Sequence, residues 1–253
     1  MTLYTSFRSE ILKTKKSSVW LLTVLGAAIA PVGLLISFNS ADGIQKLQGQ
    51  PWAKYFADGR MYSSGIFLPF FIILLCTICA QIEYRNNAWK QVMSSPQSFG
   101  TIFFSKFLVI QFFILCFIIL HNALILVSGA VLYIIEPKTG FLNHAPDWGY
   151  LLPQIVKSYL LVLAMSTIQF GIGIRFKNFI LPIGVGFVFW VVTMIMAEHY
   201  AGGMEYFPYA YSFVGSMADF EKFVPQALWG SVAYAVIFLG LFFALFTLDK
   251  EKG

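Results

Sequence analysis

The chain contains six uninterrupted apolar stretches, each long enough to cross a lipid bilayer as a helix. A transmembrane helix needs about 20 such residues to cross a hydrocarbon core of about 30 Å. Because the stretches are continuous and do not alternate with polar residues, they favour helices over membrane strands. We therefore expect an all-α polytopic membrane protein with six transmembrane helices. The stretches run from Ser18 to Phe38, Met61 to Ile82, Phe107 to Ile135, Leu151 to Ile174, Phe179 to Ala197 and Ala227 to Leu248.

The composition excludes several other classes of protein. Of the 253 residues, 58% are hydrophobic and 11% are charged, whereas about a quarter of the residues in a soluble domain are charged. An ordinary soluble enzyme, a disordered tail and a nucleic-acid-binding module are therefore excluded, and we expect no nucleic-acid partner. Three cysteines are too few for a disulfide framework. Residues 1–253 are expected to form a single domain embedded in the lipid bilayer.

The distribution of charge predicts how the chain is oriented in the membrane. With six spans, both termini lie on the same side. The segments on that side carry 11 of the 17 Lys and Arg residues, and the opposite loops carry eight of the 12 acidic residues. Because basic residues flank spans on the cytoplasmic side, we expect both termini to be cytoplasmic.

Residues 1–17 precede the first span and combine apolar with basic side chains. Leu3, Phe7 and Ile11 recur every four residues, which is the spacing of one helix face. The pattern predicts a short amphipathic helix on the inner leaflet, and a plain basic flank is the alternative. The first span is too long for the apolar core of a signal peptide, so we expect it to be retained.

Several polar side chains fall within the spans. Intramembrane polar groups often mark a substrate pathway, although they also join neighbouring helices through hydrogen bonds. Both roles stay open for the four candidates, which are Gln111, His121, Asn122 and Gln169. His121 also suggests an alternative function, that of a non-transport membrane protein such as a haem-binding or assembly factor.

The sequence contains no familiar catalytic or nucleotide-binding motif. It lacks a G-x-S-x-G serine elbow, an H-E-x-x-H zinc motif and a G-x-x-x-x-G-K-[ST] phosphate loop. Cys76 and Cys79 form a C-x-x-C pair within the second span, but no second pair and no nearby histidine accompany it. We therefore expect neither a catalytic residue nor a metal site, and any ATP that drives this protein would bind to another chain.

Residues 83–106 form the largest cytoplasmic connection, between the second and third spans. Residues 86–93 can form two turns of helix that expose Trp89, Lys90 and Met93. Ser95 and Pro96 are typical of a helix N-cap and first helical position, and the helix that they begin would lead into the third span. Such a segment suits a groove on a soluble partner or the lipid surface, and the pattern does not decide between them.

The same connection resembles a known family. Glu83 and Arg85 form a Glu-x-Arg directly after the second span, a Trp-Lys and a Ser-x-Pro follow, and Lys106 opens the third span. This pattern resembles the type-2 permeases of ATP-binding-cassette (ABC) exporters. The stretch from Ser9 to Ser17 is similar to the branch that serves lantibiotic and bacteriocin self-immunity, although that branch often has an aromatic residue where this chain has Ile11-Leu12.

The resemblance implies a permease subunit that has no nucleotide site of its own. ATP and Mg would bind to soluble ABC ATPase subunits, which would join two permeases, identical or paralogous, in the bacterial plasma membrane. The substrate would be an antimicrobial peptide or another amphipathic molecule, moved out of the cell or the membrane to give self-immunity or antibiotic resistance.

The resemblance also assigns roles to three parts of the chain. Residues 1–17 would be the connecting helix, residues 83–106 the coupling segment, and the aromatic residues 198–226 a set of short outer helices. Those outer aromatic rings would meet either the substrate or lipid headgroups. The residues that contact the ATPase would be Glu83, Arg85, Trp89, Lys90 and Met93.

Overall fold

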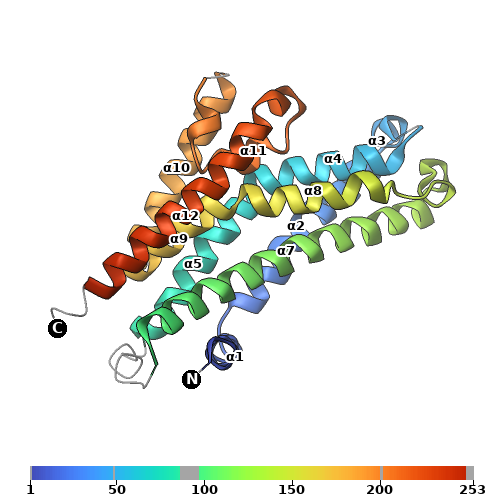
Figure 1. Ribbon diagram of the computed structural model, residues 1–253. Helices are drawn as coiled ribbons and strands as arrows, with labels where there is room; N and C mark the ends of the chain where they lie inside the picture. Colours follow the sequence, from blue (N-terminus) through green and yellow to red (C-terminus); the bar gives the residue numbers. More distant parts are fainter. Residues whose placement is uncertain (1, 48, 86–96, 200–201, 249–253) are drawn as a thin grey trace.

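The computed structural model describes residues 2–47, 49–85, 97–199 and 202–248, and these parts are almost entirely helical, with no strand among them (Figure 1). Six of its helical segments are long and apolar enough to cross a membrane. This confirms the all-α polytopic fold. The segments are α2 (Val19–Phe38), α4, η1 and α5 (Pro51–Tyr62, Ser63–Phe67 and Leu68–Arg85), α7 (Phe99–Ile135), α8 and α9 (Trp148–Leu161 and Leu163–Arg175), α10 (Ile180–Glu198) and α12 (Val224–Leu248).

Shorter helices connect these spans. Within the described residues, one short helix precedes the spans, three lie in the connections that follow α2 and α7, and three lie between α10 and α12. In chain order they are α1 (Leu3–Thr14), α3 (Ala41–Lys46), η2 (Pro137–Thr139), η3 (Phe141–Asn143), η4 (Met204–Tyr206), α11 (Tyr211–Val214) and η5 (Ala218–Phe223).

The second span is longer than the sequence predicted. It begins at Pro51 and not at Met61, because α4 is amphipathic: Tyr55 and Phe56 are fully buried on one face while charged side chains occupy the other. Pro51 suits the first helical position, where no backbone N–H is needed. A hydropathy window treats the charged face as a loop, and this accounts for the ten-residue difference.

A π-helical turn, η1, separates α4 from α5 within this span. Such wide turns free backbone carbonyl groups from the regular helical pattern. Two of these carbonyls have partners on other helices: Trp190 Nε1 of α10 donates to Gly65 O at 2.8 Å, and Ser212 Oγ of α11 donates to Ser64 O at 3.0 Å. The turn therefore links the second span to α10 and to the short helices that follow it.

Helix α7 forms the centre of the packed core. It contacts α1, α2, α5 and α9, and its Phe113 and Phe117 are fully buried. The ring of Phe117 stacks on that of Phe71 from α5, with centroids 4.5 Å apart. On α2, Gly26 leaves room for this ring, since a Cβ at that position would lie 3.1 Å from Phe117 Cε2.

The segment 198–226 forms short helices, as expected. Its aromatic rings divide between two environments. Tyr209 and Tyr211 are buried and Phe220 is 5% exposed, so these rings pack into the bundle, whereas Tyr206 is 67% exposed. Most of the aromatic rings in this segment therefore pack against the hydrophobic core next to the short helices and do not form an exposed binding surface.

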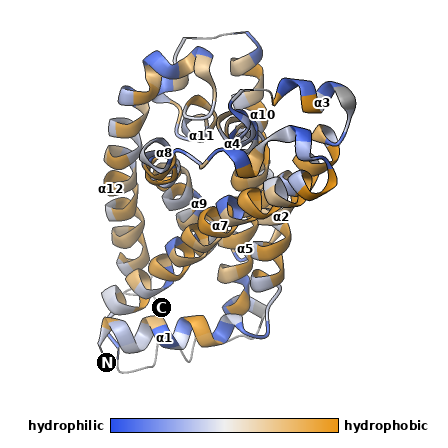
Figure 2. Cartoon of the chain, turned by 90° about the vertical axis from the view of Figure 1, so that its right-hand side faces the viewer, coloured by the Kyte–Doolittle hydropathy of each residue, from blue (hydrophilic) through white to orange (hydrophobic). Residues whose placement is uncertain are grey.

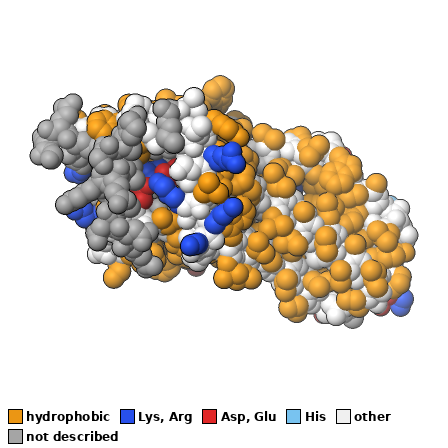
Figure 3. Space-filling model, turned by 90° about the horizontal axis from the view of Figure 1, so that it is seen from below, with side chains coloured by type: hydrophobic (Ala, Val, Ile, Leu, Met, Phe, Trp, Pro, Cys, Tyr) orange, Lys and Arg blue, Asp and Glu red, His pale blue; other side chains and the backbone are white. Residues whose placement is uncertain are grey.

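Helix α1 lies across one end of the bundle, roughly at right angles to the spans (Figure 2). The last residues of α12 reach the same end (Figure 1). Seen from below, Lys and Arg side chains gather near this end, and most of the remaining visible surface is apolar (Figure 3). Such a surface suits lipid contact along the sides of the bundle.

Candidate functional site

Helix α1 begins with a defined cap and packs against the bundle with part of its apolar face. The hydroxyl of Thr2 accepts a hydrogen bond from Thr5 N, which satisfies one of the free N–H groups at a helix start. Phe7 and Ile11 pack against the core, and the ring of Phe7 meets that of Phe112 on α7 edge-on at 6.1 Å. Two of the three residues expected on lipid thus pack against the core, while Leu3 is 43% exposed.

The coupling segment leaves the bundle at the end of α5 and returns at the start of α7. Helix α7 begins at Phe99, and its N-cap is Ser98, whose hydroxyl accepts from Thr101 N at 3.2 Å. The predicted cap, Ser95 with Pro96, was therefore placed too early for this helix. Both residues, like Trp89, Lys90 and Met93, lie outside the described residues.

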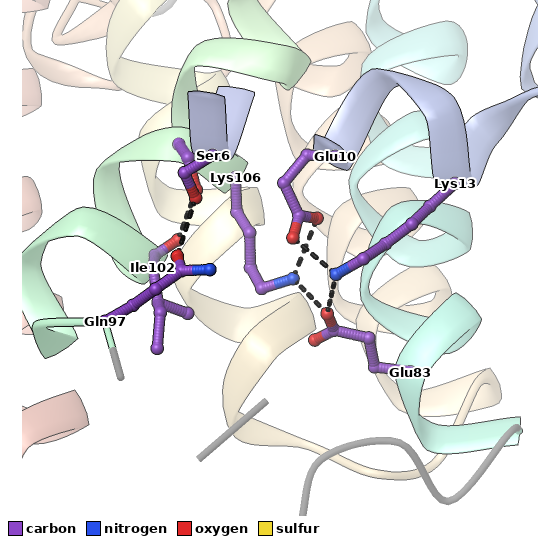
Figure 4. A network of polar contacts seen from close by, with 8 residues as sticks. Ser6, Glu10, Lys13, Glu83, Gln97, Ile102 and Lys106 are labelled. Atoms are coloured by element: carbon purple, nitrogen blue, oxygen red, sulfur yellow. Dashed lines mark hydrogen bonds and ion pairs between the residues drawn. The ribbon is translucent and has the colours of Figure 1, made fainter. Parts of the chain in front are cut away.

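Four charged side chains form a closed ring where α1, α5 and α7 meet (Figure 4). Lys13 Nζ lies 2.5 Å from Glu10 Oε1 and 3.0 Å from Glu83 Oε1. Lys106 Nζ lies 3.0 Å from Glu10 Oε2 and also forms an ion pair with Glu83 Oε1. Each lysine therefore bridges both glutamates, and signs alternate around the ring.

Burial of the ring increases towards the coupling segment. The side chain of Glu83 is 3% exposed and that of Lys106 10%, against 15% for Glu10 and 34% for Lys13. Charges removed from water are costly unless each has a partner. The two lysines balance the two glutamates, so the ring can be buried as an electrically neutral unit.

The charges of the ring shift the pKa values of its two members on α1. Burial opposes ionisation of Glu10, but the nearby charges of Lys106 and Lys13 outweigh it, and the pKa of Glu10 falls below its ordinary value. Burial likewise opposes the charge of Lys13, but Glu10 and Glu83 outweigh it, and the pKa of Lys13 rises. Both groups are therefore held in their charged forms at neutral pH.

A second polar contact ties α1 to the other end of the coupling segment. Ser6 Oγ donates to Gln97 Oε1 at 3.0 Å, and its distance to Ser105 Oγ is also 3.0 Å (Figure 4). Gln97 directly precedes the cap of α7. Helix α1 therefore contacts the last turn of α5 through Glu83 and the entry to α7 through Gln97, so one helix holds both ends of the segment.

The space beside the ring is small. A cavity of about 20 Å³, lined by the ring and by apolar residues of α5, α7 and α9 such as Cys79 and Phe170, adjoins it. That volume suits about one water molecule. The ring is thus a packed junction and offers no room for a substrate.

Two of the predicted pathway residues hydrogen-bond between helices. Gln111 Nε2 donates to Ser166 Oγ at 3.1 Å and links α7 to α9. Gln169 Nε2 donates to Pro182 O of α10 at 2.8 Å, and its Oε1 accepts from Tyr209 OH at 2.8 Å. Both amides are buried, and these contacts support the packing alternative for them. A role in substrate passage stays a prediction.

The other two predicted pathway residues lie farther along α7. Asn122 Nδ2 donates to Ile118 O of its own helix at 2.8 Å. His121 is 3% exposed, its Nδ1 lies 3.2 Å from Ala27 O of α2, and the backbone of Gly59 also lies near the ring. This histidine therefore occupies a tight contact among α2, α4 and α7. Within the described residues, no group of three His, Cys, Asp or Glu side chains could hold a metal ion.

The sequence identified one member of the ring, Glu83, as a site residue and missed Glu10, Lys13 and Lys106. Of the other coupling residues, Arg85 ends α5. The spacing of Glu10 and Lys13, three residues apart on one helix, is a signal for a local ion pair. The contacts of this pair with α5 and α7 depend on where α1 lies, which spacing alone does not encode.

Comparison with known protein families identifies a match over most of the chain. The family model described as ABC-2 family transporter protein matches residues 6–193. The matched region contains most of α1, the whole connection between α5 and α7, and all four members of the charged ring. No curated protein and no solved structure matched the chain.

Proposed function

Because that match covers most of the chain, the protein belongs to the ABC-2 transporter family as a membrane-spanning component, and we propose that it is the permease subunit of an ATP-driven exporter. In this proposal, ATP and Mg bind to soluble ABC ATPase subunits that seat on the coupling segment. The assembly lies in the bacterial plasma membrane with both termini of the permease in the cytoplasm, in keeping with the excess of Lys and Arg on that side.

The observation that carries this proposal is the closed ring of Glu10, Lys13, Glu83 and Lys106. It joins α1 to the two helices that flank the coupling segment. A displacement of that segment by an ATPase would therefore move α1, α5 and α7 together. Helix α7 has 37 residues, which correspond to about 55 Å at 1.5 Å per residue, so movement of its start would reach the opposite leaflet.

The ATPase contact itself is proposed to include Arg85, Trp89, Lys90 and Met93. An exposed aromatic residue beside basic side chains is a frequent anchor for a groove on a soluble partner. Glu83 belongs to the same motif but is buried, so its role is to hold the segment in position while its neighbours bind.

The proposed substrate is an antimicrobial peptide or a similar amphipathic molecule, and its export would give self-immunity or resistance. The acidic loops opposite the termini would attract a cationic peptide. Exposed rings at the same end, among them Tyr206 and Trp148, would hold its apolar face. This part of the proposal rests on charge and exposure alone.

A second permease, the same chain or a paralogue, would complete the transporter. The exposed apolar residues of α10, which include Phe187, Val188 and Ile195, offer a lateral surface for it. Lipid suits the same surface, so the stoichiometry of the purified complex is the measurement that tests this part.

The experiment uses the full chain expressed with its candidate ATPase and reconstituted in liposomes. We expect the ATPase to co-purify with the wild-type permease and to be lost with Trp89→Ala. With Glu83→Gln, we expect the ATPase to stay bound while transport per ATP hydrolysed falls. The matched control is Lys54→Gln, which removes an exposed ion pair with Asp58 on the opposite side. Absence of any co-purified ATPase, or unchanged coupling in both variants, would contradict the proposal.

A further inference from the structure

A separate hydrophobic core lies at the end of the bundle away from α1 (Figure 1). Its buried side chains come from the end of α2, from α4, from the second half of α7, from η3 and from the start of α8, and we call it the distal core. They include Leu34, Trp52, Tyr55, Ile125, Phe141 and Leu151. Trp52 Nε1 donates to Phe141 O at 2.9 Å, and Tyr55 OH donates to Ser128 Oγ of α7 at 3.1 Å. These helices therefore form one tightly packed unit.

Three of the four long segments that enter the distal core are interrupted on the way. Helix α2 contains Pro31, and a proline in a helix interior removes a backbone hydrogen bond and bends the helix. The second span contains the π-helical turn η1, and the fourth span breaks at Val162, between α8 and α9. In Figure 2, α8 points towards the viewer, whereas α9 runs down the bundle. Helix α7, in contrast, is a continuous helix of 37 residues.

The break at Val162 is caused by a side chain from another helix. Residues 159–164 contain neither glycine nor proline, which are common sources of a sharp kink. The hydroxyl of Ser231, on α12, donates to Leu160 O at 2.7 Å and accepts from Ala164 N at 3.2 Å. In an unbroken helix these two backbone groups, four residues apart, would bond to each other. The serine therefore takes the place of one helical hydrogen bond.

A second serine holds the interruption in the second span. Ser212 Oγ of α11 donates to Ser64 O, within η1, at 3.0 Å. Ser212 is 5% exposed and Ser231 is fully buried. Both serines lie on α11 and α12, whose buried residues, such as Tyr211 and Ala227, belong to a cluster separate from the distal core. One part of the chain thus contacts both breaks.

The break at Val162 has two arrangements in which every polar group is bonded. In the arrangement observed, Ser231 joins Leu160 O to Ala164 N. If the hydroxyl withdraws, Ala164 N can donate directly to Leu160 O, and the serine can donate to the carbonyl four residues before it on α12, as serines within helices do. Unpaired backbone groups are costly in lipid, and neither arrangement leaves one. Two such alternatives are what a conformational switch requires.

We propose that the helices around the distal core move as one body, with Pro31, η1 and Val162 as hinges and with α7 as the rigid helix that connects this body to the charged ring. Ser212 and Ser231 hold the body in its bent position. A tilt of α7 at its start would then swing the distal core relative to α11 and α12. The hinges belong to the chain itself and are measured without an ATPase, so only their coupling to ATP rests on the proposed function.

The experiment measures distances between pairs of spin labels in the purified full chain by double electron–electron resonance. A ketone-bearing amino acid carries each label, so that the native cysteines stay in place. The labelled positions are exposed and replace Ala53 on α4, Leu152 on α8 and Trp229 on α12. Positions 53 and 152 each lie ten residues before their hinge, or about 15 Å, so a change of about 20° in the kink would move each by about 5 Å.

In Ser231→Ala, the backbone groups at the break lose the hydroxyl that separates them. We expect the distances from position 229 to positions 53 and 152 each to change by about 5 Å. The distance between positions 53 and 152 should stay constant, because α4 and α8 move together. Ser158→Ala on α8 is the matched control. Its hydroxyl donates to Gln154 O of the same helix at 2.9 Å, and its loss should leave all three distances as in the wild type.

Two results would overturn the proposal. Unchanged distances in the double variant of Ser212→Ala with Ser231→Ala would show that the bent position does not depend on these hydroxyls. A change in the distance between positions 53 and 152 would show that α8 moves without α4. If Ser231→Ala does not fold, Ser231→Cys gives the same readout, because a thiol occupies the site but forms only weak hydrogen bonds.

Discussion

Lys106, in the second turn of α7, forms an ion pair with Glu83, in the last turn of α5 and 23 residues earlier in the chain. The pair joins the two helices, α5 and α7, between which the coupling segment runs. Through Glu10 and Lys13 the same two residues also hold α1.

Glu83→Gln should destabilise the protein by about 3 kcal/mol. The substitution leaves two lysines facing a single carboxylate, and one of them, Lys106, is largely buried. Thermal unfolding in detergent measures the loss. The control Lys54→Gln breaks an exposed pair and should change the stability by less than about 1 kcal/mol. Equal losses of stability in the two variants would mean that the buried ring stabilises the bundle no more than an exposed ion pair does.

The alternation of signs around the ring predicts which charge exchanges are tolerated. Exchanging only Glu83 and Lys106 keeps their own pair but sets like charges together at both contacts with α1. We expect that double variant to be no more stable than Glu83→Gln. Inverting all four members restores every opposite-sign pair and should recover most of the stability. Rescue by the simple exchange would show that Glu83 and Lys106 act as an isolated pair.

The attachment of α1 should depend on pH only at the extremes. The pKa of Glu10 lies below its ordinary value of 4.5, so its contribution to stability is present above about pH 4.5 and is lost as the pH falls through the lowered pKa. The pKa of Lys13 lies above its ordinary value of 10.5, so its contribution is present below about pH 10.5 and is lost as the pH rises through the raised pKa.

Hydrogen exchange of the α1 amides, corrected for the intrinsic rate, measures this dependence. We expect constant protection between about pH 5 and 10 and a loss of protection on the acid side. Glu10→Gln should remove the acid-side change. A transition near neutral pH in the wild type would assign control of α1 to a group outside the ring.

Gly173→Ala should push α9 a few tenths of an ångström away from α5. A Cβ on Gly173 would lie 3.0 Å from the carbonyl oxygen of Cys76, and a backbone group cannot turn aside as a side chain can. We expect a loss of about 1–3 kcal/mol in thermal unfolding. Gly240→Ala on α12 is the control, because no atom lies within 4 Å of the added methyl group, and it should be neutral or slightly stabilising. Equal melting temperatures would refute the close approach.

Hydropathy was sufficient to predict the six spans, because each apolar run alone exceeds the thickness of a bilayer. It failed where a helix has two unlike faces. Helix α4 buries Tyr55 and Phe56 yet exposes Lys54, so its window is no longer uniformly apolar. The start of α7 was misplaced for another reason: Ser95 and Ser98 are both residue types that favour an N-cap, and α7 begins after Ser98, whose hydroxyl accepts from Thr101 N.

The site was harder to predict than the fold. The motif in the coupling segment pointed to Glu83, and the basic flank drew attention to residues 1–17, but no local pattern states that the two regions touch. The contact arises because α1 lies across the bundle end and brings Glu10 and Lys13 to α5 and α7. Contacts between residues so far apart in sequence depend on tertiary packing, and spacing within one helix carries no information about them.

Helix α1 contacts both ends of the connection, at Glu83 and at Gln97. These two contacts have a consequence for the evolution of such transporters. Tyr84, the first residue after Glu83, still donates to Ile174 O of α9, but changes in the sequence beyond it would leave the two contacts of α1 in place. A permease built in this way can exchange one ATPase partner for another by altering a dozen residues, and the membrane bundle keeps its structure. Partner choice and membrane architecture are then inherited as separable modules.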